Sequence, residues 1–483
     1  MGRVRVRLAV ISVCLLVVGL VPGCDRDEEP RSVVWDAPPP RVVSAWAEEP
    51  PFAYNTYSDV DGSGRWVAFM HSVRDGAPGV YLRDMRTEKI TRLDVWQTRP
   101  QPVPGSPEDE RGYRLGSAFP SISTDGRYVA FHSGSPYLLP RDHNGTPDVF
   151  RYDRVTARLE LVSVDRDGRQ ANRYSVNPSI SADGRFVAFQ SRASNLGSER
   201  AHQEDIYVKD MKTGEVELVS VGQASTSPQG TVFNPSISED GTRVAFISAA
   251  GDLVEDDTNR ATDAFVADLV EDTVTRVSVT SDGGQLVPLE YSESASSYRD
   301  GIDDVVLSGN GNVVAFVSHA NGLVPEDENN NVDVFTHDLR DGITERVSVT
   351  SNGDDAYPRE SDRECGLNGQ CFTFVSSGAP SISRDGRYVA FSSGSRVLGG
   401  LPGNRSDGMV FLHDRETGLT VPVSRDRGGR AVGSNNYYYG DLSLDARWIT
   451  FSTDHRLLGR RAGTGENGDV YLQQIPIPFE IAT

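Results

Sequence analysis

The chain has 483 residues, of which 69 are acidic and 48 basic, and its formal net charge at pH 7 is −21. Beyond the first few residues it contains no cluster of lysine or arginine, which argues against nucleic acid as a partner. Solubility alone explains an acidic surface, and cation binding is the alternative that a local motif would have to support.

Residues 1–23 are predicted to be a secretory signal peptide. Arg3, Arg5 and Arg7 form a basic start, and the apolar run over 8–20 is too short for a spanning helix of about 20 residues. The ending Leu-Val-Pro-Gly before Cys24 resembles a bacterial lipoprotein signal, in which the cysteine takes the lipid. The alternative is an ordinary signal with an incidental cysteine. Either way we expect export, and with lipid an anchor to the membrane on its periplasmic or extracellular side.

Residues 24–40 are charged and rich in proline, with too little apolar content to fold. They are predicted to tether a folded domain over 41–475, which is followed by a short C-terminal tail over 476–483.

One motif recurs through the whole of that domain. Its best copy runs Pro178-Ser-Ile-Ser-Ala-Asp-Gly-Arg-Phe-Val-Ala-Phe-Gln-Ser191. The aromatic residue that closes each copy falls at Phe69, Phe131, Phe189, Phe246, Phe316, Phe391 and Phe451. Seven copies spaced at roughly 60-residue intervals indicate a repeat architecture that fills the domain.

Each repeat reads as four short strands. Asp183-Gly184 is a hairpin turn between the first two strands, since glycine accepts a positive φ. A third strand begins at Asp205 and a fourth at Val216. No stretch has helical apolar periodicity that competes with this pattern. The fold class predicted is therefore all-β, a seven-bladed β-propeller of four-stranded antiparallel blades, with a β-sandwich or an open solenoid as the alternatives.

The run Ser-x-Asp-Gly-Arg-x-Val-Ala-Phe, followed by Asp-Val-Phe-x-x-Asp-x-x-Thr, resembles the repeat of TolB-type, WD-repeat-like propellers of bacterial envelope proteins. The resemblance spans about residues 40–475 and implies the fold. It implies a protein-binding role in the cell envelope only weakly, because the same repeat occurs in hydrolases.

The last repeat lacks a fourth strand after Asp469, and Pro476 and Pro478 interrupt the segment where that strand would lie. Residues 42–45 resemble the missing strand. We therefore predict that the N-terminal segment pairs with residues 469–474 and closes the ring, which removes an open sheet edge.

Two kinds of local motif could carry chemistry. Cys365 and Cys371 stand alone as a pair, which favours a disulfide over a metal site. The pattern Asp-x-Asn-x-x-x-Asp precedes the third strand in three repeats and resembles the opening of a calcium loop. Its alternative is an Asx turn. The candidate calcium ligands are Asp142, Asn144, Asp148, Asp257, Asn259, Asp263, Asp327, Asn329 and Asp333.

Catalytic motifs are sparse, and whether the protein is an enzyme stays open. The sequence contains no Gly-x-Ser-x-Gly elbow, no His-Glu-x-x-His and no phosphate loop. We expect a monomeric, membrane-anchored propeller that binds a protein partner. The alternative is a propeller for carbohydrate or cell-wall ligands, with or without hydrolase or lyase activity. A concave pocket with two or three carboxylates and exposed aromatic residues would favour that alternative, whereas a broad flat face would favour protein docking.

The face that carries the long loops is predicted to bind. In an antiparallel meander the connections from strand two to three, and from strand four to the next blade, emerge on one side, and variable loops usually hold binding residues. Candidates near the channel mouth are Arg173, Tyr174, Phe233, Arg299, Tyr437, Tyr438 and Tyr439. The alternative is that these aromatic residues only pack the loops.

Overall fold

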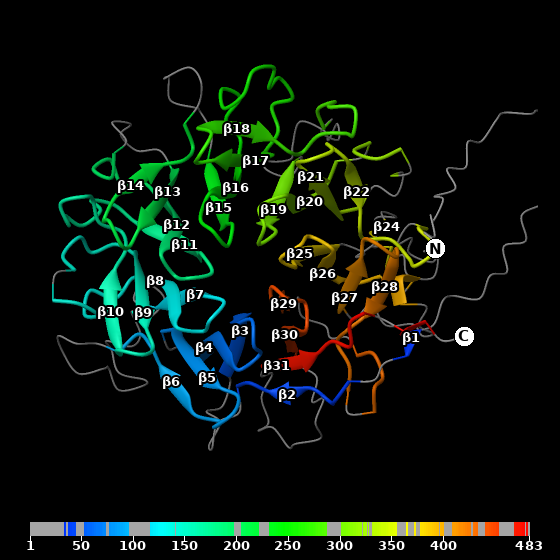
Figure 1. Cartoon of the computed structure of the whole chain (residues 1–483), viewed down its shortest axis with the longest axis horizontal. Helices are drawn as coiled ribbons and strands as arrows, with labels where there is room; N and C mark the ends of the chain where they lie inside the picture. The colour runs from blue at the N-terminus through cyan, green and yellow to red at the C-terminus, as the bar shows by residue number, and fades with distance from the viewer. Residues whose placement is uncertain are drawn as a thin grey trace, which may run out of the picture.

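A computed structural model of the chain shows a ring of seven blades around a central channel (Figure 1). The structure describes residues 33–34, 37–44, 53–73, 77–95, 116–140, 142–197, 204–221, 231–286, 301–320, 322–325, 327, 331–354, 364–365, 371–372, 377–395, 397–399, 408–426, 428–432, 440–453, 468–478 and 480–481. The predicted fold class, a seven-bladed propeller of four-stranded antiparallel blades, is confirmed.

Each blade is a meander whose first strand faces the channel. Blades 1 to 3 are formed by β3 (Ala53–Val60), β4 (Trp66–Val73), β5 (Gly79–Asp84) and β6 (Ile90–Arg92); β7 (Ser117–Ile122), β8 (Tyr128–Ser133), β9 (Asp148–Asp153) and β10 (Arg158–Leu161); and β11 (Ser175–Ile180), β12 (Phe186–Ser191), β13 (Asp205–Asp210) and β14 (Val216–Leu218).

Blades 4 to 6 have the same strand order. They are formed by β15 (Val232–Ile237), β16 (Arg243–Ser248), β17 (Asp263–Asp268) and β18 (Thr273–Arg276); β19 (Ile302–Leu307), β20 (Val313–Ser318), β21 (Asp333–Asp338) and β22 (Thr344–Arg346); and β25 (Ser377–Ile382), β26 (Tyr388–Ser393), β27 (Met409–Asp414) and β28 (Leu419–Pro422).

The seventh blade joins the two ends of the domain. It contains β29 (Gly440–Leu442), β30 (Trp448–Thr453), β31 (Asp469–Gln474) and, as its outer strand, β2 (Arg41–Val42). Arg41 pairs with Leu472 and Val42 with Tyr471, and the N–H of Val43 donates to the carbonyl of Val470 at 2.7 Å. The N-terminal segment therefore completes the last blade, which is the pairing that the sequence predicts.

The core lies within and between the blades. In every blade the aromatic residue of the repeated motif stacks on an aromatic residue of the third strand, with ring centroids 5.8 to 6.0 Å apart. Both faces of each sheet are apolar because each blade is covered on both sides; Val305 of β19, for example, packs in one cluster with Ile247 of β16. This packing holds the inner strands around the channel.

Two short pairings lie outside the blades. Val33–Val34 (β1) pairs with Glu480–Ile481 (β32), which joins the predicted tether to the predicted tail, a contact that the sequence does not predict. Glu364–Cys365 (β23) pairs with Cys371–Phe372 (β24), and the register sets Cys365 opposite Cys371. The disulfide between them stays a prediction. Within the part of the chain that the structure describes, no helix is long and apolar enough to cross a membrane.

Candidate functional site

The inner strands share a bulge at the level of the channel mouth. In β11 the register with β12 shifts between Val176 and Ser179, and five of the other inner strands show a shift at or near the same place. Proline contributes in four blades, because Pro178 and its counterparts cannot donate a ladder hydrogen bond. A bulge bends the strand and re-aims its side chains.

The residue at the bulge adopts a left-handed backbone conformation in five blades. These residues are Tyr57 (φ 44°), Phe119 (φ 51°), Asn177 (φ 52°), Asn234 (φ 53°) and Ala379 (φ 50°). We call this place the channel position. Non-glycine residues seldom adopt a positive φ, least of all bulky ones, and such strain concentrates at functional sites. Asp304 is the corresponding residue of β19. It lies two residues before Val306, which pairs with Ala315, just as Asn177 lies two residues before Ser179, which pairs with Ala188.

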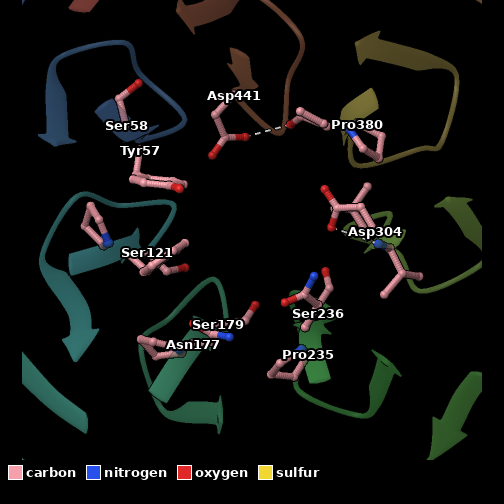
Figure 2. Close-up of a pocket in the computed structure, with 18 of the residues that line it drawn as sticks. Tyr57, Ser58, Ser121, Asn177, Ser179, Pro235, Ser236, Asp304, Pro380 and Asp441 are labelled. Atoms are coloured by element: carbon pink, nitrogen blue, oxygen red, sulfur yellow. Dashed lines mark hydrogen bonds between the residues drawn. The ribbon is translucent and has the colours of Figure 1, made fainter. Parts of the chain in front are cut away.

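These residues enclose a cavity of about 520 Å³ at the mouth of the channel (Figure 2). That volume falls in the range of small-ligand pockets. A second cavity of about 120 Å³ continues toward the short turns of the opposite face, and Ser236, Val306, Ser381 and Asp441 border both. The two cavities therefore meet at the level of these four residues.

Among the described residues that line the mouth, three are aspartates and none is lysine, arginine or histidine. Asp304 projects into the opening (Figure 2), where its Oδ1 accepts a hydrogen bond from the N–H of Val305 at 2.9 Å. Burial, and next the charge of Asp303, raise the pKa of Asp304 to about 7. Asp303 is exposed, and its Oδ2 lies 2.5 Å from Nε2 of His319.

The third carboxylate belongs to a pair at the level where the two cavities meet. Asp441 Oδ1 accepts from the hydroxyl of Ser381 at 2.6 Å, and the carboxyl group of Asp441 meets that of Asp59. Burial raises the pKa of both groups, and the charge of Asp441 raises that of Asp59 further. The two carboxyl groups consequently share a proton over a range of pH in which isolated aspartates are ionised.

Aromatic rings form one wall of the mouth. The rings of Tyr57 and Phe119 lie 4.2 Å apart, and Phe119 stacks on His132 at 5.4 Å. Phe119 remains 39% exposed, which makes it an apolar surface open to a ligand. Burial lowers the pKa of His132 to about 4, so its ring is neutral at pH 7.

The binding residues predicted from the sequence fall elsewhere or outside the described residues. Tyr174 hydrogen-bonds to Glu204 and lies under the Arg192 guanidinium, at 5.8 Å. Phe233 packs against the cluster between blades 4 and 5, and Arg173 is exposed. None of these three lines the cavity. Those outside the described residues are Cys24, Arg299, Asn329, Tyr437, Tyr438 and Tyr439.

The channel residues escaped sequence reasoning because they occupy the variable place just before the repeated motif. Tyr57, Asn177 and Asp304 have little chemistry in common. Their place in the repeat is the one feature that could have identified them. In four blades the residue lies directly before the proline of the motif and two residues before a serine, as Asn177 lies before Pro178 and Ser179.

The candidate calcium loops form compact turns before the third strand. Asn144 Nδ2 donates to Asp148 Oδ2 at 2.9 Å, and Asn259 Nδ2 donates to Asp263 Oδ2 at 2.8 Å. The other oxygen of each aspartate accepts from a serine hydroxyl of its own blade, at 2.6 Å for Asp148 and 2.5 Å for Asp263. In each loop the asparagine Oδ1 also accepts from the N–H two residues on, at 2.9 Å from Thr146 and 3.0 Å from Ala261, which is the bond of the Asx-turn alternative.

Arginine side chains stand beside the carboxylates in blades 4 and 5. Arg276 Nη1 lies 3.1 Å from Asp257 Oδ1. Arg346 Nη1 donates to Asp327 Oδ1 at 3.0 Å and lies 3.8 Å from Asp333 Oδ2. A guanidinium group thus supplies the positive charge that calcium would bring, and these two loops fit the ion poorly.

Blade 2 has no such arginine, because Leu161 occupies the corresponding place opposite the third-strand aromatic residue. Instead Gln170 Nε2 donates to Asp142 Oδ1 and Asp148 Oδ2, both at 2.8 Å. Burial raises the pKa of Asp148 to about 7. Among the described residues no three histidine, cysteine, aspartate or glutamate side chains converge to hold a metal ion. Calcium binding stays a prediction.

Known proteins resemble the chain in fold and hardly in sequence. No protein-family model and no curated protein matches it. Among solved structures, TolB from Acinetobacter baumannii is 13% identical, with 89% of this chain and 81% of that chain covered and a TM-score of 0.37.

An oligogalacturonate lyase from Vibrio parahaemolyticus is 12% identical, with 94% and 100% covered and a TM-score of 0.48. The propeller domain of the Trilobed protease from Pyrococcus furiosus is 10% identical, with 89% and 98% covered and a TM-score of 0.47. At these identities and TM-scores the likeness concerns the β-propeller fold alone, which the strand order of the chain shows by itself.

Proposed function

We propose that this protein is an exported binding propeller that takes an extended segment of a protein partner into the mouth of its channel. The observation that carries the proposal is the channel position, where five blades hold a non-glycine residue at positive φ around one cavity. Such strain is retained where the surrounding structure fixes side chains for a task. A cavity of about 520 Å³ suits a few residues of one extended chain better than a broad docking surface.

The proposal also includes export of the protein and its attachment to the membrane through a lipid. The basic start, the apolar run and Cys24 support a lipoprotein held at the membrane, so that the propeller faces the periplasm or the cell exterior. The tether would leave the channel mouth free to reach a partner in the envelope.

Carbohydrate is the second candidate ligand. The mouth is concave and combines an exposed aromatic residue, Phe119, with the carboxylates of Asp303 and Asp304. A concave pocket with carboxylates and an exposed ring is the arrangement expected for a carbohydrate or cell-wall ligand. The same carboxylates would repel a polyanionic polysaccharide, so a neutral or amino sugar is the form that this candidate takes.

A variant that fills the cavity tests the proposal. Asn234→Phe places an aromatic ring at the channel position of blade 4, where blade 2 already holds Phe119 at nearly the same φ (51° against 53°). We expect the variant to fold with an unchanged melting temperature and to retain less than a tenth of the partner that the wild-type protein captures from its own envelope. The matched control is Val155→Asn, a substitution of a 65% exposed residue on the outer rim.

Protein and glycan in the captured material are measured separately. Loss of a protein from the Asn234→Phe capture supports the first candidate, and loss of a glycan supports the second. Undiminished capture by Asn234→Phe would mean that the partner docks outside the channel.

A further inference from the structure

We infer that the channel mouth recognises an organic cation, either a primary ammonium or a guanidinium group. The inference rests on the proposed function for the place of binding and adds the chemistry of what binds. The cation could be a lysine or arginine side chain or the N-terminus of the partner segment, or it could be a free polyamine. All of these present the same charged N–H donors.

Charge is the first support. Asp303, Asp304 and Asp441 line the cavity, and among the described residues no lysine, arginine or histidine does. Within the described ranges, the one basic neighbour of these three carboxylates is His319, which lies beside Asp303 at the exposed rim. A carboxylate in a partly buried site without a positive partner is costly, and a bound cation would relieve that cost.

Unfilled hydrogen-bonding capacity is the second support. Ser58 is 5% exposed and borders the cavity beside Tyr57 (Figure 2), yet within the described chain its hydroxyl group has no hydrogen-bond partner. Buried hydroxyl groups are normally paired, so the lone oxygen of Ser58 in the cavity wall is an unfilled acceptor.

The aromatic wall is the third support. A cation is attracted to the face of an aromatic ring, and Tyr57 of blade 1 and Phe119 of blade 2 offer two rings 4.2 Å apart, with blade 1 next to the blade that carries Asp441. His132 behind Phe119 is neutral at pH 7 and adds no competing charge. Figure 2 shows Tyr57 and Asp304 projecting into the opening from different sides.

The spacing of the acids favours an organic cation over a metal ion. No three acidic, histidine or cysteine side chains within the described ranges come together as a metal site. An ammonium or guanidinium group at the end of a flexible chain can bond one carboxylate while its apolar stem lies against the rings, and it does not need converging ligands.

The test is isothermal titration of the full-length protein with end-blocked glycine pentapeptides that differ only in the central residue. That residue is lysine, arginine or glutamine, and spermidine and calcium chloride are titrated separately. We expect the lysine or arginine peptide to bind at least about tenfold more tightly than the glutamine peptide, as a charge-assisted hydrogen bond implies.

Two variants locate the effect. Asp304→Asn removes the charge while it keeps the carbonyl oxygen that accepts from Val305, so the fold is retained and the preference for the cationic peptide should disappear. Glu271→Gln on the exposed outer turn of blade 4 is the matched control and should leave the preference unchanged. Melting temperatures confirm that both variants are folded.

The pH dependence supplies a second readout. Asp304 faces Asp303 on its own strand and Asp441 and Tyr57 across the cavity, with Asp59 below and His319 at the rim. Because the pKa of Asp304 is about 7, its negative charge develops between pH 6 and 8. The affinity for the lysine peptide should therefore rise across this interval in the wild-type protein and much less in Asp304→Asn.

The possible outcomes test the inferred cation and the proposed function separately. If spermidine binds in an Asp304-dependent way and the peptides do not, the cation comes from a free amine and the inference stands. Equal affinity for lysine and glutamine peptides, binding of calcium in place of the amines, or no binding of any cation overturns it. The capture experiment with Asn234→Phe reports on the proposed function separately, because it does not depend on the charge of the ligand.

Discussion

At the scale of single residues, the electrostatics of this propeller depend on buried acidic groups and on what stands beside them. Asp327 and Asp333 lie beside Arg346, whereas Asp142 and Asp148 have the amide of Gln170 in place of a guanidinium group. An amide donates hydrogen bonds but brings no charge. With an amide in that place, burial raises the pKa of Asp148 to about 7.

The guanidinium of Arg346 should be essential to blade 5. The side chains of Arg346, Asp327 and Asp333 are only 2 to 4% exposed. Arg346→Leu would remove the guanidinium group from beside two buried carboxylates, and we expect it to lower the free energy of unfolding by about 3 to 5 kcal/mol. Chemical denaturation measures the loss.

The control for this change lies in the same blade. Arg340 pairs with Asp338 at 2.7 Å, but its side chain is 63% exposed, so Arg340→Leu should cost less than about 1 kcal/mol. A loss in Arg346→Leu as small as that in Arg340→Leu would show that the buried carboxyl groups take up protons and need no cation.

At the scale of the elements, one hydrogen bond recurs between the third and fourth strands. Asp148, Asp205, Asp263 and Asp333 each accept from a serine hydroxyl near the end of the fourth strand, at 2.9 Å or less. Ser44 makes the same bond to Asp469 Oδ1 at 2.9 Å across the closure of the ring. The same serine–aspartate hydrogen bond that joins the third and fourth strands within four other blades therefore also holds the N-terminal segment in the last blade.

Removing that hydroxyl should loosen the closure. Ser44 is fully buried, and Ser44→Ala leaves Asp469 and the N–H of Val470 without this partner. We expect a loss of about 1 to 3 kcal/mol and faster amide hydrogen exchange along β31. Ser220→Ala breaks the equivalent bond to Asp205 in blade 3 and should speed exchange only in β13 and β14. Unchanged exchange in β31 would contradict the assigned closure.

The elements themselves were predictable because their sequence signals are local and repeated. The Asp-Gly turns and the alternation around Phe131 or Phe189 define strands regardless of tertiary context, and the place of Val42 can be deduced from the strand missing after Asp469. The cavity was not predictable in this way. Its lining depends on a bulge that turns a variable residue such as Asp304 inward, and on how far apart seven blades set such residues in space.

At the scale of the whole molecule, backbone hydrogen bonds link the short turns of neighbouring blades around the ring. They run from Gly62 to Thr124, Thr124 to Ala182, Ala182 to Glu239, Glu239 to Gly309, Asn310 to Arg384 and Arg384 to Leu444, with lengths of 2.7 to 3.0 Å. Among the turns that the structure describes, those of blades 7 and 1 share no such bond. The seam between the first and last blades is instead where Asp59 and Asp441 meet.

This carboxyl pair makes the seam sensitive to pH. Four of the other blades place a serine at this level, as where Ser179 accepts from the N–H of Ile237 at 3.1 Å. Because the pKa values of Asp59 and Asp441 are raised in the folded state, the pair stabilises the protein fully below the unfolded pKa of about 4, and that stabilisation is lost as the pH rises through the raised values. Two adjacent negative charges then oppose closure of the ring.

Asp441→Asn should reduce that pH dependence, although burial still raises the pKa of Asp59. Asparagine keeps an oxygen that can accept from Ser381, and it cannot ionise, so Asp59 loses the charge that opposes its own ionisation. We expect the variant to melt at a higher temperature than the wild-type protein at pH 8, with the difference shrinking or reversing at pH 4.5. Each unit by which a pKa is raised corresponds to about 1.4 kcal/mol at high pH.

The matched control is Asp183→Asn, because blade 5 already carries Asn310 at the equivalent place in its first turn. Its melting temperature should track that of the wild-type protein at every pH. Other buried acids, Asp148 and Asp304 among them, also reduce stability as the pH rises, so the diagnostic quantity is the difference between Asp441→Asn and the wild-type protein. A difference that stays constant from pH 4.5 to 8 would mean that the two carboxyl groups at the seam do not share a proton.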